Sequence, residues 1–290
     1  MTQAGEARAG LNRLVKARGG AELPALGLGT WRMALEPARR TDEVNALKLG
    51  LDLGLTLIDT AESYASGESE RLVGEAIRGR RDQVFLVTKV LPENASRAGT
   101  IQAAERSLKR LATDRIDLYL LHTVSRHPLG GTLEALAKLT EDGKVRHYGV
   151  SNFDLAHMKE AEAHPLGRAV AANQLMYSLG KRALENDLLT WCQSRDIAIM
   201  AYSPLDEGRL LPASPTLAAV ARRHGVAPAT IAVAWTLRHP NVVSIPKAGR
   251  PEHVRDVARA LEVRLTAGDL AELDRAYPKP PPGTFEGWLV

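Results

Sequence analysis

The sequence alternates between two hydrophobic patterns, and this alternation limits the folds open to the chain. Short apolar runs typical of buried parallel strands are followed by stretches in which apolar residues recur at helical spacing. The pair of patterns repeats eight times along the 290 residues, at intervals of roughly 25 to 45 residues, as expected of a (β/α)8 TIM barrel. The structural alternative is a doubly wound sheet. It is disfavoured because no Gly-x-Gly-x-x-Gly sequence opens a helix after a strand.

The positions of the elements follow from the same patterns. The strands are predicted at 25–28, 55–59, 84–88, 116–121, 145–150, 170–173, 197–202 and 242–245. The helices are predicted at 41–53, 70–77, 101–111, 132–141, 154–163, 185–195, 216–224, 228–238, 251–261 and 266–276. Thr41 is expected to cap the first of these helices, and Gly54 to end it.

Elements outside the repeat are predicted at both ends of the chain. Residues 14–23, with the Gly19-Gly20 pair at the turn, are typical of a β-hairpin that could plug the bottom of a barrel,. The last helical patterns supply extra C-terminal helices, and the prolines of 278–282 predict an extended tail. No linker is visible, so we expect residues 1–290 to form a single domain.

Composition narrows the classes of partner. With 44% apolar and 25% charged residues and a formal charge of +4, the chain is typical of a globular protein that binds neither nucleic acid nor membrane. Its one cysteine, Cys192, lies on the apolar face of a predicted helix and fits a reducing compartment,. We therefore expect a cytoplasmic protein, and a monomer because no long exposed apolar stretch is visible.

Three successive predicted strands each end in an ionisable residue, namely Asp59, Lys89 and His122. The carboxyl ends of parallel barrel strands meet on one face, so these side chains are expected to lie together. Tyr64 follows the first of these strands closely and can bend over the same point. The arrangement predicts a catalytic site.

The four residue types suit proton transfer to a carbonyl group. A buried Lys89 needs an opposite charge, which Asp59 can supply. We expect the ammonium group to lower the pKa of Tyr64 from about 10 towards neutrality, so that Tyr64 can protonate a carbonyl oxygen. His122 can hydrogen-bond the same oxygen. None of these side chains supplies a hydride, so a cofactor is implied.

Further motifs occur at the predicted strand ends and complete an ordered set. They are Gly29-Thr30-Trp31, Asp59-Thr60-Ala61 with Tyr64, Thr88-Lys89, Leu120-Leu121-His122, Gly149-Val150-Ser151-Asn152-Phe153, Asn173-Gln174, Ala201-Tyr202-Ser203-Pro204-Leu205 and Ile245-Pro246-Lys247. On these motifs the sequence resembles the aldo-keto reductases over nearly its whole length. The resemblance implies NADPH-dependent reduction of aldehydes or ketones, without a metal.

The resemblance also implies which residues bind the cofactor. They are Gly29, Thr30, Asp59, Ser151, Asn152, Gln174, Tyr202, Ser203, Leu205, Lys247 and Arg250. In the family, Ser151, Asn152 and Gln174 would bind the nicotinamide carboxamide, and Tyr202 would stack on the ring. Ser203 and Leu205 would follow the pyrophosphate.

The family pattern places cations at the far end of the cofactor. Lys247 and Arg250 would meet the 2′-phosphate that distinguishes NADPH from NADH. The chain departs from the family there, because it has His253 and Asp256-Val257 where many members have Arg and Glu-Asn. Use of NADH therefore stays open.

The substrate pocket is implied to include Trp31, Tyr64, His122 and Thr123. Thr123 stands where a bulky aromatic is frequent in the family, which predicts a wider and more polar pocket. Ala65 replaces a common glycine and is expected only to tighten the backbone. The small-molecule carbonyl substrate is not specified by the surrounding loops, and small reactive aldehydes such as methylglyoxal are a guess from the family.

Two other functions are compatible with parts of the sequence. One is a nucleotide-binding regulatory barrel resembling channel-associated subunits, and the other is a Schiff-base aldolase with Lys89 as nucleophile. A metal site is disfavoured, because the histidine pairs 122/127 and 157/164 lack helical i, i+4 spacing with a supporting acid,. Aromatic residues of the tail, Phe285 and Trp288, could cover the site or could equally dock on the surface elsewhere.

Overall fold

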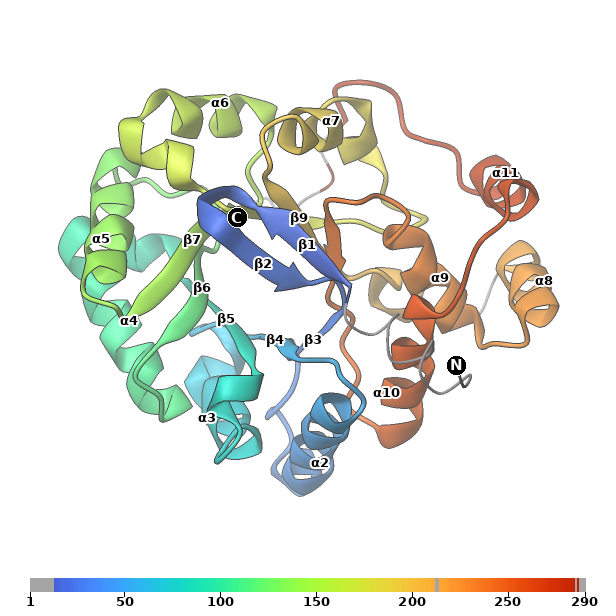
Figure 1. Ribbon diagram of the computed structural model, residues 1–290, viewed down its shortest axis with the longest axis horizontal. Helices are drawn as coiled ribbons and strands as arrows, with labels where there is room; N and C mark the ends of the chain where they lie inside the picture. Colours follow the sequence, from blue (N-terminus) through green and yellow to red (C-terminus); the bar gives the residue numbers. More distant parts are fainter. Residues whose placement is uncertain (1–12, 212–213, 285, 287–290) are drawn as a thin grey trace.

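The core of the protein is a closed barrel of parallel strands (Figure 1). The computed structural model describes residues 13–211, 214–284 and 286. Eight strands follow one another in chain order from β3 (Gly27–Gly29) to β10 (Val242–Ser244). The first and last strands meet, since Ser244 N–H donates to the Ala25 carbonyl at 2.8 Å and Gly29 N–H donates to the Pro246 carbonyl at 3.0 Å. The predicted barrel is confirmed.

Helices surround the barrel (Figure 1). The remaining strands are β4 (Leu57–Asp59), β5 (Phe85–Val90), β6 (Ile116–Leu121), β7 (Val145–Ser151), β8 (Ala172–Met176) and β9 (Ala198–Tyr202). The helices are α2 (Arg40–Asp52), α3 (Glu68–Ala76), α4 (Arg97–Leu111), α5 (Leu129–Glu141), α6 (Leu155–Ala163), α7 (Leu188–Gln193), α8 (Pro215–His224), α9 (Pro228–Thr236), α10 (Pro251–Ala258) and α11 (Ala267–Ala276). Each side chain of β6 is buried, as expected of a strand covered by helices on its outer face.

The predicted N-terminal hairpin is present and crosses one end of the barrel (Figure 1). Strands β1 (Leu14–Ala17) and β2 (Ala21–Pro24) pair antiparallel, and Gly19 and Gly20 take the positive φ angles that the turn requires, 65° and 71°,. Val15 and Leu23 are buried. Arg18 N–H donates to the carbonyl of Asp196, just before β9, so the hairpin covers the amino ends of the strands.

Several predicted boundaries are wrong by a few residues, and three of them have a clear physical reason. Thr41 does not cap α2, which begins at Arg40 directly after a 3-10 turn, Pro37–Arg39, so no side-chain cap is present. The helix predicted at 185–195 is divided, because Asp187 leaves helical geometry between a 3-10 turn and α7. Strand β8 extends to Met176 rather than ending at 173. The polar Asn-Gln pair hides this extension in the sequence.

After α11 the chain is not helical, as its prolines predict, but a turn at 282–283 interrupts the predicted extended tail. It packs beside the segment before α7, where the Asn186 amide donates to the Pro280 carbonyl at 3.2 Å and the Ala183 N–H donates to the Glu286 carboxylate at 2.8 Å. The prediction that Phe285 and Trp288 cover the site lies outside the described residues. Cys192 is a buried core residue, as predicted. Within the described chain, no helix has the length and apolar character needed to cross a membrane.

Candidate active site

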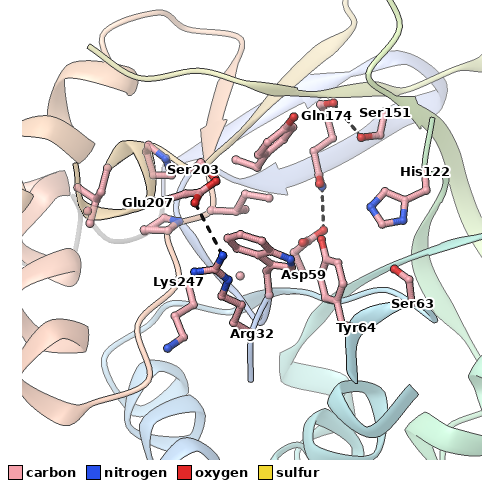
Figure 2. A pocket seen from close by; sticks show the side chains of 18 of the residues that line it. Arg32, Asp59, Ser63, Tyr64, His122, Ser151, Gln174, Ser203, Glu207 and Lys247 are labelled. Carbon is pink, nitrogen blue, oxygen red and sulfur yellow. Dashed lines mark hydrogen bonds and ion pairs between the residues drawn. The ribbon is translucent and has the colours of Figure 1, made fainter. Parts of the chain in front are cut away.

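A cavity of about 750 Å³ opens at the carboxyl ends of the strands (Figure 2). Most of the predicted site residues line it, namely Gly29, Trp31, Asp59, Tyr64, His122, Thr123, Ser151, Asn152, Gln174, Tyr202, Ser203, Leu205 and Lys247. Thr30 and Lys89 lie buried behind its wall, and Arg250 is exposed. The barrel therefore brings nearly all of these residues to one place. Figure 2 shows His122, Tyr64 and Ser63 on one side of the cavity and Ser203 and Lys247 on the other.

Lys89 is the centre of the polar network beneath the cavity. Its Nζ donates to Asp59 Oδ2 at 2.8 Å, to the Thr60 carbonyl at 2.8 Å and to Tyr64 Oη at 3.2 Å. Lys89 is fully buried and Asp59 almost so. Burial is the largest single influence and lowers the pKa of Lys89, but the charges and hydrogen bonds of Asp59 and Tyr64 together outweigh it, and the pKa is raised,. Lys89 is therefore a buried ammonium group held against Tyr64.

The turn that carries Tyr64 is a strained 3-10 segment, Tyr64–Gly67. Ala65 and Ser66 have positive φ angles of 48° and 54°, which cost side-chain-bearing residues about 1 kcal/mol each. The Ser69 hydroxyl donates to Thr30 Oγ1 at 2.8 Å, and Thr30 Oγ1 donates to the Asp59 carbonyl at 3.0 Å. The structure thus places Thr30 in the support of the turn. Ala65 strains the backbone rather than merely tightening it.

The expected lowering of the pKa of Tyr64 is wrong for this structure. Burial raises the pKa of Tyr64, the Lys89 charge opposes this, and the Asp59 charge adds to it, so the net direction is upward. The error came from weighing the ammonium group alone. It omitted the cost of forming a phenolate in a poorly solvated site next to a carboxylate. Tyr64 is consequently protonated at neutral pH.

His122 contacts Tyr64 edge to face, with ring centroids 5.8 Å apart. Burial, and secondly the charge of Lys89, lower its pKa to about 3, so the imidazole is neutral at neutral pH. Its Nδ1 is buried without a hydrogen-bond partner among the described residues. An unpaired lone pair is less costly to bury than an unpaired N–H, so we assign the proton to Nε2.

Polar groups that could bind a carboxamide form a connected set between the strand ends. Gln174 Nε2 donates to Asp59 Oδ1 at 2.8 Å, and Ser151 Oγ donates to the Gln174 carbonyl at 3.0 Å (Figure 2). The Tyr202 hydroxyl donates to Asn152 Oδ1 at 2.9 Å, and the Asn152 amide donates to the His122 carbonyl at 3.2 Å. Sequence reasoning missed that Tyr202 orients Asn152, because no sequence pattern links side chains 50 residues apart.

The far end of the cavity is positively charged. Lys247 lines it, and burial followed by the positive charge of Arg39 lowers the pKa of Lys247, with Arg250 adding to the effect. The charges of Glu43 and Glu36 oppose this lowering but do not reverse it. An anion bound here would therefore stabilise the charged form of Lys247. The sequence predicted Lys247 and Arg250 for this end and missed Arg39. His253 and Val257 also line the cavity there.

Glu62 is a further group that sequence reasoning missed. Its Oε1 accepts hydrogen bonds from the Leu91 N–H and from the Asn94 amide, both at 2.9 Å. Glu62 precedes Tyr64 by two residues, and Leu91 follows Lys89 by two. The carboxylate therefore ties the Tyr64 turn to the loop after β5. Its position inside the Asp-Thr-Ala-Glu run was the available signal.

Comparison with known proteins gives the class. The model of the aldo/keto reductase family matches residues 25–278. The chain therefore belongs to the aldo/keto reductase family, and the predicted family and oxidoreductase class are confirmed.

Individual relatives agree with this class. The chain is 46% identical over 272 residues to methylglyoxal reductase YeaE of Escherichia coli, covering 92% of this chain and 96% of the relative. It is 31% identical over 268 residues to glyoxal reductase of Bacillus subtilis, covering 91% and 92% of the two chains. A crystal structure of an aldo-keto reductase from Klebsiella pneumoniae in complex with NADPH has a TM-score of 0.92 and 44% identity, covering 96% of this chain and 99% of that one.

Proposed function

We propose that this NADPH-dependent carbonyl reductase reduces small aldehydes, with Tyr64 as the proton donor, Lys89 and Asp59 as its electrostatic support and His122 as the group that orients the carbonyl. The observation that carries the proposal is the contact of Lys89 Nζ with Tyr64 Oη at 3.2 Å and with Asp59 at 2.8 Å, beneath an open cavity. An ammonium group held there lies where negative charge forms on the phenol oxygen.

The direction of the Tyr64 pKa supports the role of acid. A proton donor must carry its proton when substrate arrives, and a raised pKa ensures this at neutral pH,. The phenolate that forms on donation is stabilised by Lys89. His122, neutral with its proton on Nε2, can donate a hydrogen bond to the same carbonyl oxygen and hold it in line with Tyr64,.

The cavity residues fit NADPH. Lys247, with Arg39 and Arg250 close enough to influence its charge, offers a site for a phosphate, and the amides of Asn152 and Gln174 offer partners for a carboxamide. Bound NADPH supplies the hydride. Asp256, which also lines the cavity, adds a negative charge near that phosphate, so the preference for NADPH over NADH is expected to be moderate.

The substrate class is proposed from the relatives and from the cavity wall. The relatives named above are reductases of methylglyoxal and glyoxal. The cavity that Tyr64 lines also includes Trp31, Leu91 and Pro92 in its wall, and these can contact a short carbon chain. Small 2-oxoaldehydes fit both observations.

The state of Lys89 opposes the aldolase alternative. A Schiff base requires an uncharged amine, whereas the raised pKa of Lys89 keeps its nitrogen protonated and donating three hydrogen bonds,. Borohydride trapping with an aldehyde is expected to give no adduct on Lys89. An adduct at that residue would support the aldolase instead.

The test of the proposal is the loss of NADPH absorbance with methylglyoxal as substrate, for wild type and Tyr64→Phe. Wild type is expected to turn over, and the variant to keep its affinity for NADPH while kcat falls. Retention of most of the rate by Tyr64→Phe would remove Tyr64 as the acid. A single domain over 1–290, a monomer and a cytoplasmic location stay predictions.

A further inference from the structure

Two hydroxyl groups next to the catalytic residues have no role in the network described above. Ser63 immediately precedes Tyr64, and Thr123 immediately follows His122. Both side chains line the cavity. Neither hydroxyl makes a hydrogen bond to any described residue, whereas Asp59, Lys89, Asn152 and Tyr202 are all hydrogen-bonded around them.

The location of Ser63 separates it from the cofactor half of the cavity. Figure 2 shows Ser63 beside His122 and Tyr64, on the side away from Lys247 and Ser203. Lys247, which could contact a cofactor phosphate, lies on the opposite side, and the carboxamide partners Ser151 and Gln174 lie above His122, away from Ser63. Ser63 is therefore placed to contact the substrate.

The mainly apolar surroundings of the Ser63 hydroxyl indicate which substrate atoms can lie against it. Trp31, Leu91 and Pro92 of the same cavity offer mainly apolar surface to a substrate chain. A hydroxyl that remains unpaired after a ligand displaces its water loses hydrogen-bond energy, so an alkyl group against Ser63 would be unfavourable. An oxygen atom of the substrate at this point would restore the hydrogen bond.

We infer that Ser63, assisted by Thr123, is a specificity-determining residue that hydrogen-bonds a second substrate oxygen, on the carbon next to the reacting carbonyl. The inference rests on the proposed reductase function. The reacting oxygen occupies the point shared by Tyr64 and His122, and the adjacent oxygen accepts from the Ser63 hydroxyl. The site thus selects 2-oxoaldehydes and 2-hydroxyaldehydes over simple alkyl aldehydes.

The experiment compares methylglyoxal with propanal, which has the same carbon chain but lacks the second oxygen. The measured quantity is the ratio of kcat/KM for the two substrates with NADPH. We expect Ser63→Ala to lower this ratio about tenfold, the effect of one hydrogen bond, mainly through KM for methylglyoxal. Thr123→Val is expected to lower it less, and propanal kinetics should change by less than about twofold.

Matched variants separate this role from a structural one. Ser63→Thr retains a hydroxyl and is expected to keep the wild-type ratio. Ser66→Ala removes a hydroxyl from the same turn at an exposed position outside the cavity, and should also keep it. Each variant is checked for its NADPH dissociation constant, which should equal that of wild type.

The outcomes are distinct from those of the proposed function. Wild type that reduces neither aldehyde would overturn the proposed function and this inference with it. Wild type that reduces both aldehydes, with an unchanged ratio in Ser63→Ala, would overturn the inference alone. An equal fall for both substrates in Ser63→Ala would show that Ser63 supports the turn rather than the substrate.

Discussion

The two ends of the barrel are built from opposite kinds of side chain. At the amino end, the hairpin β1–β2 closes the barrel with buried apolar residues such as Val15 and Leu23. At the carboxyl end, the buried groups are Lys89 and Asp59, with hydroxyls and amides around them. One end contributes stability through burial, and the other holds costly charges because chemistry needs them.

The comparison shows how one barrel can combine a stable apolar end with a site that holds buried charges. A buried charge pair is tolerated where hydrogen bonds satisfy it fully, and Lys89 donates to three oxygens. The open cavity above it leaves one direction free for substrate. Variants at the two ends should therefore change different quantities, rate at one and stability at the other.

The largest expected effect is on the rate at the carboxyl end. Tyr64→Phe removes the proposed proton donor and should lower kcat about 1,000-fold, within the usual contribution of a general acid. NADPH affinity should change by less than about threefold, because the hydroxyl is the only group lost. Stopped-flow or steady-state kinetics with methylglyoxal, together with a fluorescence titration of NADPH, measures both. A residual rate near that of wild type would contradict the assignment.

The next effect concerns the buried pair. Asp59→Asn leaves Lys89 charged and uncompensated in the barrel, which should lower the free energy of unfolding by about 3 to 5 kcal/mol. Urea unfolding measures this loss. Asp52→Asn is the control, because Asp52 pairs with Arg80 at an exposed surface and its removal should cost less than about 1 kcal/mol. Equal losses of unfolding free energy in the two variants would show that the buried Lys89–Asp59 pair is no more important for stability than an exposed ion pair.

The amino end should respond in stability alone. Leu23, in strand β2 of the hairpin, is fully buried, so Leu23→Ala should lower the free energy of unfolding by about 3 kcal/mol while kcat with methylglyoxal stays at the wild-type value. Leu14→Ala, on the exposed face of the same hairpin, should change stability by about 0.5 kcal/mol or less. A large fall in kcat for Leu23→Ala would mean that the two ends are coupled.

The pH dependence of the free energy of unfolding should report on His122 at the carboxyl end of the barrel. Its pKa is lowered to about 3 in the folded protein, against about 6.5 when unfolded. Between these values the unfolded chain binds the proton and the folded chain does not, so stability falls as pH drops from about 6.5. Between about pH 7 and about pH 5 this amounts to about 2 kcal/mol. His122→Gln should show a correspondingly smaller loss in urea unfolding, and identical losses would refute the lowered pKa.

The smallest expected effect lies in the strained turn. Ala65 has a φ angle of 48°, a region that glycine occupies without the cost to Cβ, so Ala65→Gly should raise the free energy of unfolding by up to about 1 kcal/mol. Ala137→Gly, inside α5, should instead lower it by about 1 kcal/mol. Thermal unfolding of the two variants in parallel gives the sign. Destabilisation by Ala65→Gly would show that the strain is not stored at this residue.

Prediction from the sequence succeeded for features that depend on neighbouring residues, namely the apolar periodicity of the strands and helices and the residue type at the end of a strand. The period of the apolar residues identified the barrel, and the ionisable residue at the end of each of three strands identified Asp59, Lys89 and His122. It failed at boundaries set by distant contacts. The extent of β8 is an example. The polar side chain of Gln174 can be buried because it donates a hydrogen bond to Asp59 on another strand, and the residues next to Gln174 in the sequence do not reveal this partner.

The sequence by itself determined the order of the elements, the family and the identities of the residues at the strand ends, because these depend on spacing and residue type. Only the tertiary structure decided the electrostatics of the site. The upward direction of the Tyr64 pKa and the hydrogen bond from the Leu91 N–H to Glu62 depend on burial and on partners far away in the chain. The same holds for the position of the Ser63 hydroxyl, which has no hydrogen-bond partner among the described residues. Desolvation and hydrogen bonding act through space, so they are fixed only when the barrel closes.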